Sequence, residues 1–369
     1  MRKQIHDNSI NRDRSCALSH GTWRRVGAKL ACAGACALMA GQLLLPSVAL
    51  AAKWVNVGGT QYNKGAGDEA GTWSWDGADD MKLNGYNGAG ISAQGNLNID
   101  VVGTNTITAD SLRSAIEVKD GNLAITGEGT LNATAEPQKS RSAVKVECGS
   151  LAISGDVTLN ATAGTDTIAV SGDGKTGGDV DIRGANVNVT ATNKAPHTIG
   201  IHTRAGNITI NEGADVHVEA EANGGLNAVA VYAENISSEH GGCIAVDNAK
   251  LDAAARNGCS VSVALYSSGG KDTYLSVTNG ADVTLVASDR ADVLDGVWMR
   301  AGDGVSRVLV ENSSLTVRCG DGIGHSRKHG YGIYSQSGSQ SAIPRIDIIN
   351  SNVEVSGNAA AIYAVNQGD

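Results

Sequence analysis

The residues best suited to chemistry are charged side chains in two long segments, 288–295 and 320–330. Carboxylates that hold calcium, with an Arg or Lys base, would suit a polysaccharide lyase, and paired carboxylates would suit a glycoside hydrolase. The candidates for such an active site are Asp289, Asp292, Asp321, His325, Arg327 and Lys328. A charged, exposed loop without catalysis is the favoured interpretation of these residues.

Two further sets of residues are candidates for carbohydrate binding. The aromatic residues Trp73, Trp75 and Tyr86 could stack on sugar rings, although buried rings that close the end of a stacked fold are the stronger expectation. The regularly spaced residues Asn132, Asn160 and Asn188 could contact a polysaccharide from an outer face. Strand-favouring surface residues without a ligand are the alternative for this second set.

Phosphate, metal and dinucleotide sites are not indicated. The segment Gly172–Thr176 resembles the end of a phosphate loop, but Ala169 stands where that loop needs its first Gly. Asp173, Asp179 and Asp181 lack the spacing of known calcium loops. Zinc, nucleophile-elbow and dinucleotide-binding spacings are missing as well, so we expect no cofactor and no metal.

The elements that must position these residues follow from an internal repeat. The segment Thr130–Ala135 recurs letter for letter as Thr158–Ala163, 28 residues later, and with conservative changes as Asn186–Ala191. Within it, apolar residues alternate with Asn and Thr, which is the pattern of a strand with one buried face. A period of this length is typical of repeat architectures.

Similar units continue from residue 90 to the end of the sequence. Each contains three short strands separated by Gly or Asn turns, and each begins with a small residue before an apolar one. These apolar residues are Ile91, Ile116, Val144, Ile168, Ile199, Val229, Val263, Val297, Ile333 and Ile362. The chain holds 48 Gly, 4 Pro and no Phe, which suits a narrow core of small side chains. The sequence therefore predicts an all-β, right-handed parallel β-helix of about nine to ten coils over residues 90–369.

Residues 52–89 differ from these units. Residues 72–86 read as a strand, an Asp-Gly turn and a second strand, and Trp73 shares a face with Trp75. Because an open solenoid end is an unpaired sheet edge, we expect residues 52–89 to form a small N-terminal β cap.

Residues 1–51 have the order of a secretory signal peptide. A basic start precedes the apolar run 30–45, and Ala49-Leu50-Ala51 supplies small residues for cleavage. Arg24-Arg25 leaves twin-arginine and ordinary export both open. This segment contributes +5 to a total charge of −9, so the remainder carries −14. We therefore expect a secreted or cell-surface protein that binds no nucleic acid and has no membrane span after signal removal.

Four cysteines follow the signal segment: Cys148, Cys243, Cys259 and Cys319. Coils stack about 4.8 Å apart, which places Cys148 and Cys243 about 14 Å apart and Cys259 and Cys319 about 10 Å apart along the axis. A disulfide needs Cα atoms within about 7 Å. We therefore predict four thiols and no disulfide.

The stretch 72–135 resembles exported bacterial surface proteins described as adhesin-like or carbohydrate-binding. The matching segments are Trp73-Ser-Trp-Asp-Gly77, Lys82-Leu-Asn-Gly-Tyr86, Gly95-Asn-Leu-Asn-Ile99 and Gly103-Thr-Asn-Thr-Ile107. The resemblance implies a non-catalytic, surface-associated right-handed β-helix whose partner is an extracellular polysaccharide or a host glycan. A lyase or hydrolase acting through residues 288–330 remains the alternative.

Overall fold

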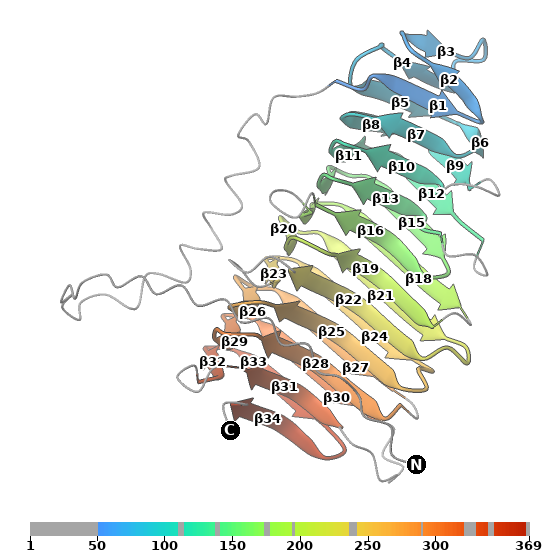
Figure 1. Cartoon of the computed structure of the whole chain (residues 1–369). Helices are drawn as coiled ribbons and strands as arrows, with labels where there is room; N and C mark the ends of the chain where they lie inside the picture. The colour runs from blue at the N-terminus through green and yellow to red at the C-terminus, as the bar shows by residue number, and fades with distance from the viewer. Residues whose placement is uncertain are drawn as a thin grey trace, which may run out of the picture. The chain divides into compact units, whose positions relative to one another are not determined.

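The structure is a computed structural model that describes residues 51–366, apart from short gaps. These gaps are 110–113, 137–140, 173–177, 194–195, 236–241, 289–290, 321–329 and 339–342. The predicted signal peptide, residues 1–51, therefore lies outside the described residues except for Ala51. The described chain is all-β, and its strands stack coil upon coil in a parallel β-solenoid (Figure 1). The predicted parallel β-helix is confirmed, but its turns number about 8, slightly fewer than the nine to ten coils predicted.

Three long sheets form the walls of the solenoid. The first sheet has the order β2 (Thr60–Tyr62), β1 (Trp54–Val57), β7 (Ile91–Gln94), β10 (Ile116–Lys119), β13 (Val144–Glu147), β16 (Asp166–Ser171), β19 (His197–Thr203), β22 (Asn227–Asn235), β25 (Val261–Gly269), β28 (Val293–Ala301), β31 (Tyr331–Ser337) and β34 (Ala360–Asn366). The second sheet has the order β3 (Ala66–Gly67), β4 (Trp73–Trp75), β5 (Asp80–Asn84), β8 (Leu97–Val102), β11 (Leu123–Gly127), β14 (Leu151–Ser154), β17 (Val180–Arg183), β20 (Ile208–Asn211), β23 (Cys243–Asp247), β26 (Thr273–Thr278), β29 (Ser306–Glu311) and β32 (Arg345–Ile349). The third sheet has the order β6 (Asn87–Ala89), β9 (Thr104–Thr108), β12 (Thr130–Thr134), β15 (Thr158–Ala163), β18 (Asn186–Asn193), β21 (Asp215–Ala222), β24 (Lys250–Arg256), β27 (Asp282–Ala287), β30 (Ser314–Cys319) and β33 (Asn352–Ser356).

Like residues stack on one another inside the solenoid. On the third sheet, Leu131 pairs with Leu159, which pairs with Val187, and all three side chains are fully buried. The alternate residues Asn132 and Asn160 point outward from the same strands. The strand alternation read from the repeat is therefore confirmed, and it explains why a core of Ala, Val, Leu and Ile suffices.

The first sheet departs from the predicted register in its middle coils. Ile168 pairs with Ile201, not with Ile199, and Val297 pairs with Leu265, not with Val263. The apolar residues predicted to open three of the units (the anchors of those units) are therefore wrong by two residues: Ile199, Val229 and Val263. Ile201 belongs to the main core, whereas Ile199 pairs with the outward Asp166 and does not belong to it. Both residues fit the apolar pattern of the sequence, so that pattern alone could not reveal the shift.

The same strands bend at a small residue. Gly200 and Ile201 are consecutive and both buried, so the in-and-out alternation of the strand is interrupted between them. Outward side chains therefore lie before and after this point as two separate groups. A Cβ on Gly200 would lie 2.2 Å from Cγ1 of Val218, so no larger side chain fits there. The bend separates two outward columns of side chains, one of which contains Asp166 and the other His202.

The N-terminal end is closed by antiparallel strands. β1 pairs with β2 and β7, and β4 pairs with β3 and β5, all antiparallel. The strand, turn and strand predicted over residues 72–86 correspond to β4 and β5. β5 and β6 also pair in parallel with β8 and β9. Part of the segment 52–89 thus belongs to the parallel stacks, and the cap differs slightly from the one expected.

No disulfide joins Cys148, Cys243, Cys259 or Cys319 in the part of the chain that the structure describes, as the coil spacing predicts. Among the described residues there is also no helix long and apolar enough to cross a membrane.

Candidate functional site

Most of the predicted catalytic candidates lie outside the described residues: Asp289, Asp321, His325, Arg327 and Lys328. Asp292, the remaining candidate, is an exposed residue just before β28. No geometry therefore relates these residues to one another.

The candidate aromatic residues of the cap are buried. Trp73, Trp75 and Tyr86 retain 6%, 3% and 7% of their surface, and all three belong to the main core. Indole Nε1 of Trp75 donates to the carbonyl of Ala78 at 3.0 Å, and the Tyr86 hydroxyl donates to the carbonyl of Ala89 at 2.8 Å. These rings cover the first coil, as the stronger of the two expectations held, and present little surface on which a sugar could stack.

The three candidate asparagines form a column on the outer face of the third sheet. Nδ2 of Asn160 donates to Oδ1 of Asn132 at 2.8 Å, and Nδ2 of Asn188 donates to Oδ1 of Asn160 at 2.9 Å. Nδ2 of Asn132 donates to the carbonyl of Asn105 at 3.3 Å. The amides of this asparagine column therefore bond mainly to one another, which stabilises the stacking of coils.

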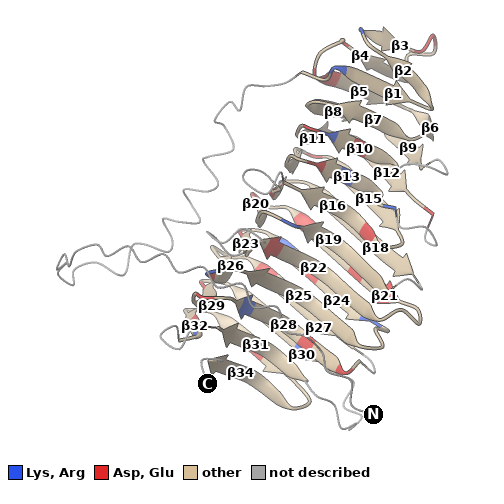
Figure 2. Cartoon of the chain, viewed as in Figure 1, with Lys and Arg blue, Asp and Glu red and all other residues tan. Residues whose placement is uncertain are grey.

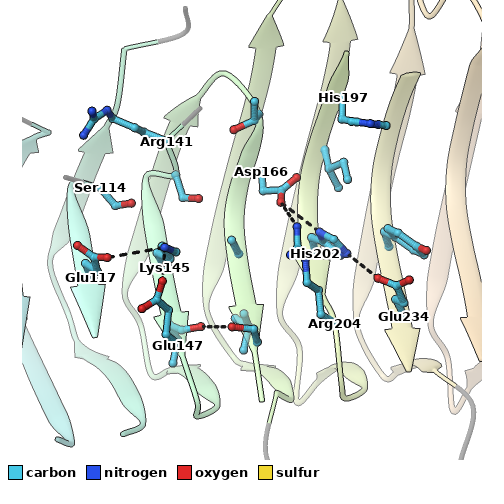
Figure 3. Close-up of a pocket in the computed structure, with 18 residues that line it drawn as sticks. Ser114, Glu117, Arg141, Lys145, Glu147, Asp166, His197, His202, Arg204 and Glu234 are labelled. Carbon is cyan, nitrogen blue, oxygen red and sulfur yellow. Dashed lines mark hydrogen bonds and ion pairs between the residues drawn. The ribbon is translucent and has the colours of Figure 1, made fainter. Parts of the chain in front are cut away.

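A hollow of about 790 Å³ lies instead on the outer face of the first sheet. It extends across β10, β13, β16, β19 and β22, and its lining is rich in charged and hydroxyl side chains (Figure 3). Acidic and basic positions are interspersed on these strands (Figure 2). The lining residues are Ser114, Glu117, Arg141, Ser142, Lys145, Val146, Glu147, Thr165, Asp166, Ala169, Val170, Ser171, His197, Ile199, His202, Arg204, Tyr232 and Glu234.

The middle of the hollow lies over β16, where the outward side chains are small. Ala169 pairs with Lys145 on one side and with His202 on the other. Ser171 lies two residues further along the same strand and pairs with Glu147. A short side chain between two long ones leaves space at the level of a single coil, and this accounts for the depression.

Lys145 forms a charged cluster at one side of the hollow. Its Nζ lies 3.7 Å from Oε1 of Glu117, on the preceding coil, and it also contacts Oε1 of Glu147. Glu117 is additionally paired with Lys119 at 3.6 Å. These pairs bring opposite charges from neighbouring coils together and neutralise Lys145 locally.

His202 forms a second charged cluster on the opposite side. Its Nδ1 lies 3.2 Å from Oδ2 of Asp166, and its Nε2 lies 3.7 Å from Oε2 of Glu234. Arg204 approaches the same oxygen of Asp166 at 3.7 Å. Only 5% of the His202 side chain is exposed. The cluster therefore holds an imidazole between carboxylates from the preceding and the following coil (Figure 3).

This arrangement shifts the pKa values of its members. Burial lowers the pKa of His202, but the contacts with Asp166 and Glu234 outweigh it, so the net pKa is raised. Burial raises the pKa of Asp166, but the contacts with His202 and Arg204 leave it below its ordinary value. The contact with His202 also holds the pKa of Glu234 low. The raised pKa of His202 and the lowered pKa values of Asp166 and Glu234 widen the pH range in which the imidazole and both carboxylates are charged together.

An aromatic column continues from His202 toward the C-terminal coils. It consists of His202, Tyr232, Tyr266, Trp298, Tyr334 and Tyr363, which occupy equivalent positions on successive coils. Ring centroids lie 4.7, 4.6 and 4.8 Å apart over its first four members, with the rings stacked. Because the ring faces cover one another, mainly their edges and polar atoms face outward.

Arg141 lies at another edge of the hollow, at the end of the strands where His197 is also found (Figure 3). Its Nε atom is buried and has no hydrogen-bond partner among the described residues. Among the residues that the structure describes, no carboxylate forms an ion pair with it. The hydroxyl residues Ser114, Ser142 and Thr165 line the same part of the hollow.

The sequence analysis did not identify this site. Its members come from five coils separated by unequal numbers of residues, and three of the predicted anchors were shifted by two. The available signal was the recurrence of His202, Tyr232, Tyr266, Trp298, Tyr334 and Tyr363 one residue after an inward apolar residue. That signal becomes visible only when the anchors are placed correctly.

Within the described ranges, no group of three or more His, Cys, Asp or Glu side chains is arranged to hold a metal ion. Comparison of the chain with protein-family models, with curated proteins and with solved structures gives no match.

Proposed function

We propose that this chain is an exported, surface-associated β-helix protein that binds a glycan without catalysis, in the hollow of the first sheet. The observation that carries the proposal is the hollow itself, which spans five coils and measures about 790 Å³. Pockets of roughly 300–1,000 Å³ are of the size that holds small ligands. Its lining comes from successive coils, which suits a chain of sugar units.

The chemistry of the lining favours a polar ligand. Most small-molecule pockets are lined by apolar side chains with a few polar groups. This one is lined by carboxylates, cations, hydroxyls and imidazoles, which together supply both donors and acceptors. A sugar presents hydroxyl groups that both donate and accept, so it matches such a surface better than an apolar ligand would.

The neighbouring features support the same proposal. The aromatic column begins at His202 and leads away from the hollow along the first sheet. A glycan extending beyond the hollow would meet ring edges and polar atoms there. The basic, apolar and small-residue order of residues 1–51 supports export, and a secreted or surface location gives access to an extracellular polysaccharide or host glycan.

The proposed site differs from the sites expected from the sequence. Trp73, Trp75 and Tyr86 are buried, and the asparagine column bonds largely to itself. For the alternative of a lyase or hydrolase acting through residues 288–330, the described residues provide no supporting observation.

Blocking the hollow from its floor tests the proposal. Ala169→Tyr would fill the space over β16, while its backbone pairing stays unchanged. Ala152→Tyr is the matched control, because Ala152 lies at an outward position of β14 on the second sheet. The exported protein would be applied to an array of neutral and acidic glycans, and hits would be quantified by calorimetry.

The parent and Ala152→Tyr should bind the same glycan, and Ala169→Tyr should lose it. A parent protein that binds no glycan would contradict the proposal. Equal binding by Ala169→Tyr would place the ligand elsewhere.

A further inference from the structure

Charge is balanced over most of the hollow. Lys145 is neutralised by Glu117 and Glu147, and His202 lies between Asp166 and Glu234. Opposite charges that already satisfy one another offer a ligand little net attraction. A charged ligand group would therefore be recognised where one charge remains without a partner.

Arg141 is that charge among the described residues of the hollow. Arg204 has Asp166 as a partner at 3.7 Å, whereas no residue that the structure describes forms an ion pair with Arg141. Its Nε atom is removed from solvent without a hydrogen bond. Buried donors are almost always bonded, so an orphaned guanidinium nitrogen indicates a missing acceptor. The hydroxyls of Ser114 and Ser142, both more than nine-tenths buried, are further donors nearby.

The guanidinium selects the chemistry of the acceptor. Arg presents a planar fork of N–H donors that matches a carboxylate with two parallel hydrogen bonds. A densely sulfated or phosphorylated polymer would meet strong repulsion, because the chain after residue 51 carries −14. One carboxylate on an otherwise neutral or sparsely charged glycan avoids most of that repulsion.

We infer that the hollow recognises a carboxylate-bearing sugar, with Arg141 binding the carboxylate while the balanced clusters of Lys145 and His202 contact the sugar hydroxyls. This inference rests on the proposed function and specifies its ligand as an acidic glycan. Arg141 is a specificity residue in this arrangement, because the remaining contacts would serve a neutral sugar equally well.

Calorimetric titration of acidic glycans against their uncharged counterparts tests the inference. The probes are oligogalacturonate and a hyaluronan oligosaccharide, each with its methyl ester, and sialyllactose with lactose. The protein variants are R141Q, R141K and the control R318Q. Arg318 is exposed on the third sheet, so its loss removes the same charge at a distance from the hollow.

The parent should bind at least one acid more tightly than its neutral counterpart, by about ten-fold to a hundred-fold for one charge-assisted bond. R141Q should abolish this preference while keeping the affinity for the neutral form. R318Q should leave the preference unchanged. R141K, which keeps the charge but not the fork, should fall between the parent and R141Q, and this separates recognition from a loss of folding.

The outcomes distinguish carboxylate recognition by Arg141 from glycan binding by the hollow. Equal affinity of the parent for acid and neutral forms overturns the role of Arg141 and leaves the proposed function intact. If R141Q still prefers the acidic glycan, the role of Arg141 is likewise overturned and the proposed function stands. Failure of the parent to bind any acidic or neutral glycan overturns both.

Discussion

The outer faces of the first and third sheets are built from the same coils but differ in the polar groups that they leave free to bind a ligand. On the third sheet, the asparagine column repeats one residue type and bonds its amides along the axis. On the first sheet, the outward residues change from coil to coil, from Lys145 to Ala169 to His202 and Tyr232. Regular repetition satisfies polar groups within the fold. Irregularity produces a hollow and an orphaned donor, and these are the features that a ligand can use.

The largest effect should come from the core that both faces share. Leu131→Asp places a charge in the stacked column between the buried Asn105 and Leu159 and should lower the free energy of unfolding by about 4–5 kcal/mol. Asn132→Asp, one residue away and outward, is the control and should cost far less. Denaturant titration measures both. Equal stability of the two variants would mean that the faces are assigned the wrong way round.

The next largest effect should come from replacing Asp295, near the C-terminal end of the first sheet. This change should stabilise the protein, whereas Leu131→Asp destabilises it. Asp295 is fully buried, and burial raises its pKa to about 7 although it accepts a bond from the Tyr331 amide at 3.0 Å. A raised pKa in the folded state means that stability falls as pH rises from about 4 through about 7. The amide side chain of the variant Asp295→Asn cannot ionise. The free energy of unfolding of this variant, relative to that of the parent, should therefore be about 3 kcal/mol higher at pH 8 than at pH 4.

Urea denaturation at both pH values measures this difference. A constant difference between parent and Asp295→Asn across this range would show that Asp295 ionises in the folded protein as it does in the unfolded chain.

His202 should show a smaller effect, and the stability that it contributes to the parent should also fall as pH rises. His202→Ala removes the imidazole from between Asp166 and Glu234 and should cost about 2 kcal/mol, because both carboxylates are partly solvated. The pKa of His202 is raised, so the stabilisation it provides is complete below about pH 6.5 and is lost as pH rises through the raised value. Thermal melting at pH 6 and pH 9 should show the larger deficit at pH 6. A deficit that grows toward pH 9 would contradict the charged state assigned to this cluster.

The smallest effect should come from the asparagine column. Asn160→Ala removes the bonds to Asn132 and Asn188 and should cost about 1 kcal/mol, because these amides are partly exposed to water. The affinity for any glycan bound by the parent should not change, which calorimetry can verify. A fall in affinity would show that the third sheet also binds ligand, and the contrast between the two faces would then be lost.

The same contrast explains what could be predicted from the sequence. Leu131 and Leu159 lie in identical segments, so the stacking of the third sheet and the burial of its alternate residues follow from the repeat. The coil spacing also gives the correct expectation for the cysteines. These features depend on local alternation and on strand spacing, which are the same in every coil.

The candidate site depends on register between coils of unequal length. Ile199 and Ile201 both fit the apolar pattern, but only Ile201 stacks on Ile168. Gly200 and Ile201 are consecutive buried residues, and simple alternation does not predict such a break. The misplaced register takes Ile199, Val229 and Val263 for core residues, although Ile201, Val231 and Leu265 occupy the core. It also places His202 beside the wrong neighbours. Arg141 likewise follows a segment of variable length, and its lack of an acidic partner is a property of the folded surface.

The stacking of coils also has a mechanical consequence. The hydrogen bonds that join one coil to the next run along the axis, and each coil contacts mainly its immediate neighbours. A force applied along this axis therefore loads one interface at a time, and the rod should unravel in steps. A released coil of about thirty residues would lengthen the chain by on the order of 100 Å. A ligand that crosses the five coils from β10 to β22 would join those interfaces, so that they yield together and at a higher force.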